Sequence, residues 1–137
     1  MQFTTFVAQI LSLAAAASAV SVAYDQVYDN GGQSTNTVSC SDGSNGLAPR
    51  FPTFGSFPQF PYIGAADAVA GWNSPSCGTC WQLTYNGKSI NVLAIDHAAS
   101  GFSISLDAMN ALTNGRAVEF GRVDATSTQV AASACGI

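Results

Sequence analysis

Two aspartates in the second half of the chain are candidates for carbohydrate chemistry. Asp96 directly follows the apolar run Ser89 to Ile95, and Asp107 lies in a short segment with helical spacing. Hydrolysis of a glycosidic bond generally needs two carboxyl groups about 5 to 9.5 Å apart. Each residue also has a structural alternative, because Asp96 could start a turn and Asp107 could stabilise the first turn of a helix.

Five further side chains could complete a groove for a sugar chain. Asp42 and Asn45 lie in a polar, Gly-rich loop, and Trp72 lies in a Gly-Trp-Asn-Ser loop where its ring could stack on a sugar. Tyr24 and Asp25 would join them if the N-terminal strand lies beside the groove. The alternative for Asp42 is a local role, in which its carboxylate bonds backbone amides of its own loop.

The remaining reactive residues favour disulfides over catalysis. His97 is the single histidine, so neither a Ser/His/Asp set nor a zinc site has support. Cys77 and Cys80 have the C-x-x-C spacing of a redox pair, but a strand-like run follows them, where no helix N-terminus would stabilise a thiolate. With Cys40 and Cys135 they make an even number, which predicts two disulfides among three possible pairings. We expect no metal or other cofactor.

The first residues have the layout of a secretory signal peptide. Met1 to Ala19 carries no charged side chain, contains an apolar run and ends in Ala-Ser-Ala. The run is too short to span a bilayer as a helix. We predict cleavage within about two residues of Ala19, with a buried N-terminal helix as the alternative. Residues 20–137 would then form one domain, secreted into an oxidising compartment.

The charge of the chain excludes several classes of partner. It has four basic and eight acidic residues, a net charge of −4. Nucleic acid and anionic membrane surfaces both require clustered Lys and Arg, so neither is expected. A surface with so few charges presents hydroxyl, amide and aromatic groups, which suit neutral polar ligands such as carbohydrates.

Local patterns indicate a small barrel that would position these residues. Alternation in Trp81 to Tyr85, then Asn86-Gly87 and a second apolar run, predicts a hairpin with Trp81 in the core. Ser105 and Asn114-Gly115 predict the two ends of a helix. We also expect a helical turn ending near Arg50 and strands in 22–28, 37–40, 65–72, 102–105, 117–125 and 127–135. This mainly β pattern, with one or two short helices, is typical of a closed barrel without free edges.

The segment Arg50 to Tyr62 is rich in Phe and Pro. Its prolines exclude a helix or a central strand. We expect an ordered loop whose rings pack against the barrel as a second core. The alternative is an exposed aromatic patch for a ligand or for self-assembly at interfaces.

Four segments together resemble the cerato-platanin family of small secreted fungal proteins. They are SVAYDQVYD, CSDGSNGL at Cys40 to Leu47, GWNSPSCGTCWQLTYNGKSINVLAID at Gly71 to Asp96, and the closing GRVDATSTQVAASACG. The resemblance covers nearly all of residues 20–137. It implies a six-stranded double-ψ β-barrel, as in expansin N-terminal domains, with the disulfides Cys40–Cys77 and Cys80–Cys135.

The resemblance also implies a function. It points to the extracellular space and the fungal cell wall, to binding of chitin or N-acetylglucosamine oligomers and of cellulose, and to non-hydrolytic loosening of wall polysaccharide. It further implies elicitation of plant defence through a plant receptor. Asp107 departs from the expansin His-Phe-Asp pattern, because here it follows Ser105-Leu106. A self-assembling wall protein and a weak endoglycanase are the alternatives.

Overall fold

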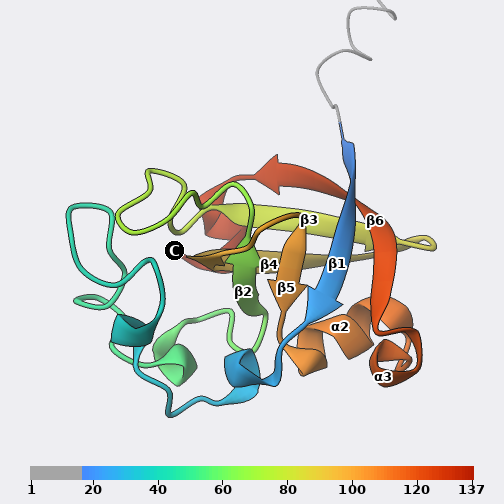
Figure 1. Cartoon of the computed structure of the whole chain (residues 1–137), viewed down its shortest axis with the longest axis horizontal. Helices are drawn as coiled ribbons and strands as arrows, with labels where there is room; N and C mark the ends of the chain where they lie inside the picture. Colours follow the sequence, from blue (N-terminus) through green and yellow to red (C-terminus); the bar gives the residue numbers. More distant parts are fainter. Residues whose placement is uncertain (1–16) are drawn as a thin grey trace, which may run out of the picture.

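The computed structural model describes residues 17–137. Six strands form a closed barrel in the order β1-β5-β2-β4-β3-β6, and Figure 1 shows α2 and α3 beside one end of it. The strands are β1 (Ser18–Tyr24), β2 (Ile63–Ala66), β3 (Cys80–Tyr85), β4 (Lys88–His97), β5 (Phe102–Ile104) and β6 (Arg122–Val130). The helices are α2 (Leu106–Thr113) and α3 (Ala117–Phe120), with 3₁₀ turns η1 (Gln26–Asp29), η2 (Thr35–Thr37), η3 (Phe54–Ser56) and η4 (Ala132–Cys135). The mainly β, six-stranded class is confirmed.

The strand pairing is that of a double-ψ barrel. β1 pairs in parallel with β5, and β2 in parallel with β4, although each pair is far apart in the chain. The other four pairings are antiparallel. β1 and β6 close the barrel, with Ser18 opposite Ser127 and Ala23 opposite Arg122.

The two elements with the strongest local signals form as predicted. β3 and β4 make a hairpin in which Asn86 (φ 51°) and Gly87 (φ 81°) both adopt the left-handed conformation of a type I′ turn. Ser105 caps α2 by accepting a hydrogen bond from the Ala108 N–H. Asn114 ends that helix in the left-handed conformation.

Three predicted segments in the first half of the domain are wrong in type or extent. The first strand ends at Tyr24, because the Asp25 carboxylate accepts a hydrogen bond from the Val27 N–H and starts η1. Residues 37–40 are not a strand, because the Ser34 side chain caps η2 and turns the chain. β2 is Ile63–Ala66 and not 65–72. The turn before Arg50 is present, with the Phe51 N–H donating to the Leu47 carbonyl.

The last segments also differ from the prediction. Residues 117–120 are helical, because the Asn110 side-chain oxygen accepts from the Ala117 N–H and the Thr113 hydroxyl accepts from the Arg116 N–H. β6 continues without a break to Val130, and residues 132–135 are a 3₁₀ turn that delivers Cys135 to the core.

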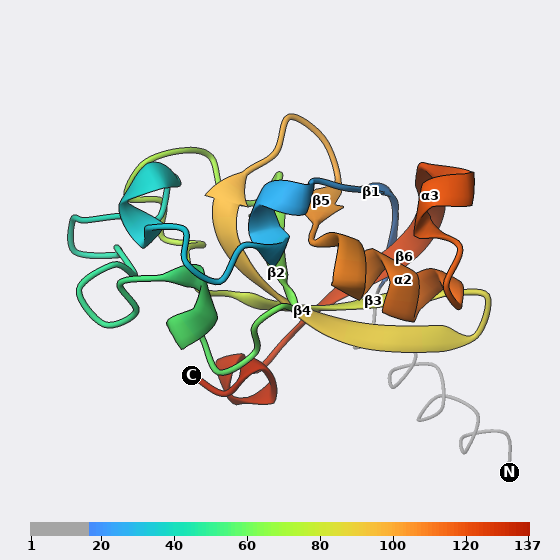
Figure 2. The same ribbon diagram turned by 90° about the horizontal axis from the view of Figure 1, so that it is seen from below.

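Two buried clusters fill the molecule. One lies inside the barrel and includes Leu83, Met109 and Leu112. The other lies under the loops of residues 28–62, which Figure 2 shows on the side of the barrel away from α3. Phe54 and Phe57 are buried in the second cluster, so the Phe-rich loop is a second core and not an exposed patch.

The disulfides are Cys40–Cys77 and Cys80–Cys135, as the resemblance implied. Each cysteine of the C-x-x-C pair therefore bonds a distant partner. Cys40, Cys80 and Cys135 are fully buried.

Most of the predicted signal peptide lies outside the described residues, so its cleavage stays a prediction. Ser18 and Ala19 fall within β1, where they pair with Ser127 and Thr126. Among residues 17–137, no helix combines the length and apolar character needed to cross a membrane.

Candidate functional site

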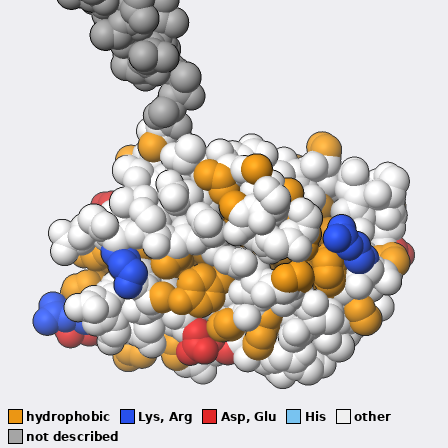
Figure 3. Space-filling model, turned by 180° about the vertical axis from the view of Figure 1, so that it is seen from behind, with side chains coloured by type: hydrophobic (Ala, Val, Ile, Leu, Met, Phe, Trp, Pro, Cys, Tyr) orange, Lys and Arg blue, Asp and Glu red, His pale blue; other side chains and the backbone are white. Residues whose placement is uncertain are grey.

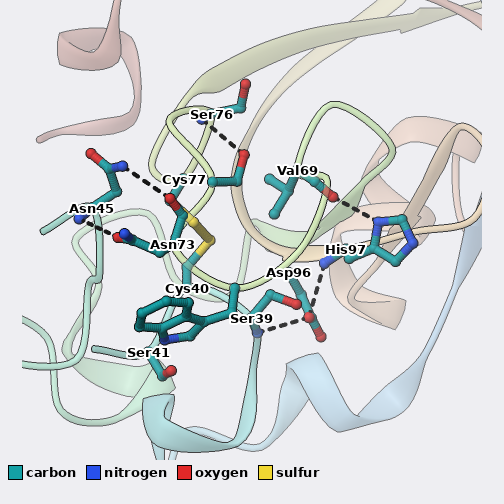
Figure 4. Close-up of a disulfide and its surroundings, with 12 residues drawn as sticks. Ser39, Cys40, Ser41, Asn45, Val69, Asn73, Ser76, Cys77, Asp96 and His97 are labelled. Atoms are coloured by element: carbon teal, nitrogen blue, oxygen red, sulfur yellow. Dashed lines mark hydrogen bonds between the residues drawn. A yellow bond between two sulfur atoms is a disulfide. The ribbon is translucent and has the colours of Figure 1, made fainter. Parts of the chain in front are cut away.

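Asp96 is the centre of a hydrogen-bond network at the end of β4. Its Oδ2 accepts from the Tyr28 hydroxyl at 2.8 Å. Its Oδ1 accepts from the backbone N–H groups of Ser39, at 3.0 Å, and His97, at 2.9 Å. The network ties three segments together, and Figure 4 shows Asp96 beside the loops joined by the Cys40–Cys77 disulfide.

Tyr28 is locked in its protonated form by this arrangement. Its side chain is only 5% exposed. Burial, the nearby Asp96 charge and hydrogen bond, and the charge of Asp25 all raise the pKa of Tyr28 above its ordinary value of 10.0. The phenol therefore stays a hydrogen-bond donor to Asp96 across the physiological range.

A hollow of about 340 Å³, which we call the central depression, opens between β1, β5 and the loop after β4. Its polar lining comes from Ser21, Asp25, Tyr28, His97, Ser100, Ser103 and Arg122. Asp96 does not line it, but hydrogen-bonds Tyr28 and directly precedes His97. Asp96 therefore positions the lining, and Asp25 contributes a carboxylate to it.

The imidazole of His97 has a fixed orientation. Its Nδ1 lies 2.7 Å from the carbonyl oxygen of Val69. A carbonyl can only accept, so Nδ1 is the protonated nitrogen. Nε2 of the neutral ring is then free to accept a hydrogen bond.

Asp42, Asn45, Trp72 and Asn73 form a second polar surface, which we call the Trp72 platform. The Trp72 ring is 63% exposed, and its Nε1 donates to Asp42 Oδ1 at 2.6 Å. The Asn45 N–H donates to Asn73 Oδ1 at 2.8 Å, and the Asn45 side-chain amide donates to the Asn73 carbonyl at 3.0 Å. These bonds, some of them drawn in Figure 4, hold an aromatic face in solvent.

The close approach of the two platform loops depends on Gly43. Its φ is +86°, and a Cβ there would lie 2.6 Å from Asn73 Oδ1 and 3.1 Å from Trp72 Cζ2. The Cys40–Cys77 disulfide joins the same two loops covalently. The Ser39 N–H, next to Cys40, donates a hydrogen bond to Asp96. The platform is therefore connected to the hydrogen-bond network of Asp96 and Tyr28.

The other two predicted residues lie apart from these surfaces. Tyr24 is half-buried against the barrel core. Asp107 lines a different hollow, of about 400 Å³, with Asp29 and Gln26. Asp29 holds the start of α2 there, since its two oxygens accept from the Leu106 and Asp107 N–H groups.

Sequence reasoning missed the residues that act as supports. Tyr28 was assigned to a strand face, and neither Asp29 nor Asn73 was singled out. The partners of Tyr28 and Asp29 are 68 and 77 residues away, so no local pattern marks them. The position of Asn73 beside Trp72, in a sequence typical of a turn, is the one pattern that could have indicated its role.

Comparison with known proteins identifies the family. The family model described as cerato-platanin matches residues 20–137. The chain belongs to the cerato-platanin family. Allergen Asp f 15 of Aspergillus fumigatus is 55% identical over 116 residues, which cover 85% of this chain and 76% of the relative.

Solved structures of the cerato-platanin family share the fold. Cerato-platanin 2 from M. perniciosa is 52% identical with a TM-score of 0.85, covering 88% of this chain and all of that chain. The solution structure described as the fungal elicitor Cerato-Platanin is 42% identical with a TM-score of 0.78, covering 85% of this chain and 96% of that chain.

The chemistry available at these surfaces is recognition by hydrogen bonds and stacking. The central depression offers carboxylate, hydroxyl, imidazole and guanidinium groups, and the platform offers an indole face with carboxylate and amide groups. Within residues 17–137, no three His, Cys, Asp or Glu side chains are grouped to hold a metal ion.

Proposed function

We propose that this cerato-platanin is a secreted fungal cell-wall protein that binds chitin or N-acetylglucosamine oligomers and loosens wall polysaccharide without hydrolysis. The observation that carries the proposal is the Trp72 platform, an exposed indole held in place by Asp42. We propose cellulose as a second ligand, because its chain has the same extended shape.

The rigidity of the platform supports a binding role. An aromatic ring can stack on the apolar face of a sugar, and its exposure is otherwise unfavourable. The bond to Asp42 orders the ring before the ligand arrives, so less conformational entropy is lost on binding. Asn45 beside the ring offers amide groups to sugar hydroxyls.

The state of Asp96 favours binding over hydrolysis. Both of its oxygens already accept hydrogen bonds, and one donor is a buried phenol. Asp107, its proposed partner in an endoglycanase, lines a separate hollow. Competition for interchain hydrogen bonds, each contributing about 0.5–1.5 kcal/mol, can let polysaccharide chains slip without cleavage.

A titration with sugar oligomers tests the binding site. We would titrate ¹⁵N-labelled protein with chitohexaose and with cellohexaose. Saturable shifts at Trp72, Asn45 and Tyr28 are expected, with Trp72→Ala weakening binding about tenfold. Val118→Ala is the matched control, since Val118 is 69% exposed and lies on α3.

Two results would count against the proposal. Equal affinity of Trp72→Ala and Val118→Ala would remove the platform from the site. Release of soluble reducing sugar, lost in Asp96→Ala, would show an endoglycanase instead.

We propose elicitation of plant defence as a second role of the same surface, acting through a plant receptor. Its support is the likeness to the solved fungal elicitor Cerato-Platanin. Infiltration of leaves with the protein should trigger an oxidative burst that is reduced for Trp72→Ala. A burst unchanged by that substitution would separate the receptor contact from the sugar surface.

Burial of the Phe-rich segment removes one of the two observations that suggested self-assembly at interfaces, and the low content of charged residues is the other. The Phe-rich segment places Phe51, Phe54 and Phe57 in the second core. We therefore place the function in the polar surfaces.

A further inference from the structure

A further hollow, of about 290 Å³, lies between the β3–β4 turn, the end of α2 and α3. We call it the hairpin pocket. It shares no lining residue with the central depression and none with the Trp72 platform. The proposed function leaves it unused.

The charge of the hairpin pocket is opposite to that of the whole molecule. The chain has four basic residues and a net charge of −4, yet Lys88 and Arg116 both line this pocket and no acidic residue does. Glu119 is exposed on α3 but is not part of the lining. Figure 3, a view from behind, shows basic side chains at its left end, where the hairpin and α3 lie, with hydrophobic atoms and a few acidic atoms beside them.

Two aromatic rings are part of the lining of the pocket. Tyr85 and Phe120 meet edge to face, with ring centroids 6.3 Å apart. The Arg116 guanidinium lies 5.8 Å from the Phe120 centroid. Both rings are half-buried, so the pocket presents apolar ring surface directly beside a cation.

The polar residues of the pocket lie on two turns with defined backbone conformations. Asn86 and Asn114 both adopt left-handed backbone conformations, with φ of 51° and 59°, and both are exposed in the lining. The Arg116 N–H donates to the Thr113 hydroxyl at 3.2 Å, which fixes the turn that carries the guanidinium. The backbone that carries these side chains is therefore ordered before any ligand binds.

We infer that the hairpin pocket binds an acidic oligosaccharide through a uronic acid residue. A carboxylate matches the fork of the Arg116 guanidinium and the point charge of Lys88. The apolar face of the sugar ring matches Tyr85 and Phe120, and its hydroxyls match the two Asn amides. A bare inorganic anion would use the cations and leave the rings and amides without a role.

Titration with uronate oligomers tests this inference. The probes are trigalacturonate and a glucuronate oligomer, followed by NMR at low salt, with sodium sulfate as an anion without a sugar ring. We expect saturable shifts at Tyr85, Asn86 and Phe120, and weaker binding as salt is added. The stronger of the two uronates identifies the source of the natural polysaccharide.

Charge-matched variants separate this pocket from a general charge effect. Arg116→Gln should weaken uronate binding about tenfold. Arg50→Gln, which removes the same charge from a residue that stacks on Phe51, should change it less than about twofold. Lys88→Gln provides a second variant if Arg116→Gln disturbs the packing on Phe120.

Four outcomes would overturn the inference. They are no uronate binding, shifts confined to the central depression, equal losses in Arg116→Gln and Arg50→Gln, and sulfate binding as strong as uronate binding. Chitohexaose titration of the same samples reports the proposed neutral-sugar site independently, so failure of one site is distinguishable from failure of the other.

Discussion

Two of the four aspartates that the sequence singled out accept hydrogen bonds from aromatic side chains of the protein itself. Asp96 accepts from the Tyr28 hydroxyl, and Asp42 accepts from the Trp72 indole. Residue type and position beside an apolar run were enough to mark Asp96 as a candidate site residue. They could not show that its oxygens are already occupied, because its phenol partner is 68 residues away.

Tyr28→Phe should test the strength of that network. The substitution removes the donor to a partly buried carboxylate, so we expect the free energy of unfolding to fall by about 1–3 kcal/mol. Urea denaturation would measure it. Tyr24→Phe is the control, because no hydrogen bond of the Tyr24 hydroxyl occurs among the described residues, and equal losses in the two variants would contradict the role of Asp96.

The raised pKa of Tyr28 predicts a loss of stability at alkaline pH. The unfolded chain releases the phenol proton near its ordinary pKa of 10.0, whereas the folded protein keeps it. Above pH 10 the native state then binds more protons than the unfolded state. The contribution of Tyr28 to the free energy of unfolding is therefore fully present below pH 10 and decreases as the pH rises above it. Stability measured between pH 9 and pH 11.5 should fall more steeply for the wild-type protein than for Tyr28→Phe. Parallel curves would contradict this assignment.

At the scale of elements, prediction succeeded where the signal was local. The hairpin and α2 carry their turn and cap residues within a few positions, and both form as expected. η1, η2 and α3 were missed because each starts from a side chain that bonds a backbone N–H. Such bonds compete with extended structure, and they produce no periodic pattern of hydrophobic residues from which a helix could be predicted.

The loop that leads into β5 depends on one glycine at a close approach. Gly101 has φ +61°, and a Cβ there would lie 2.1 Å from the Ser21 carbonyl oxygen of β1. We expect Gly101→Ala to destabilise the protein by roughly 3 kcal/mol or more, because β1 must move. Gly87→Ala should cost only about 1–2 kcal/mol, since its φ is +81° but no atom lies within 4 Å. Thermal unfolding of both variants measures these losses. Equal decreases in Tm would show that the close contact of Gly101 with β1 does not add to the cost of the substitution.

At the scale of the whole molecule, the sequence predicted a closed barrel but left the disulfide pairing among three possibilities. Pairing is a long-range property, with sequence separations of 37 and 55 residues. The family resemblance supplied what spacing could not. The central depression and the Trp72 platform likewise depend on segments that are far apart in the sequence.

Removal of the Cys40–Cys77 disulfide should loosen the Trp72 platform more than the barrel. The double variant Cys40→Ser/Cys77→Ser should lose about 2–4 kcal/mol of stability, and its Trp72 fluorescence should become more easily quenched by iodide. Cys80→Ser/Cys135→Ser is the control, because that bond joins β3 to η4 and not the two platform loops. Equal quenching in the two variants would show that the disulfide does not support the platform.

The pairing of β1 with β6 determines when this chain can fold. β6 is the last strand to be synthesised, and it lies between β1 and β3 in the barrel. Until the ribosome has made it, β1 lacks its antiparallel partner and the barrel stays open. Cys80 must also wait for Cys135, which follows β6. The complete barrel and its second disulfide can therefore form only after β6 and Cys135 have been synthesised, which makes this part of the chain the late step in folding.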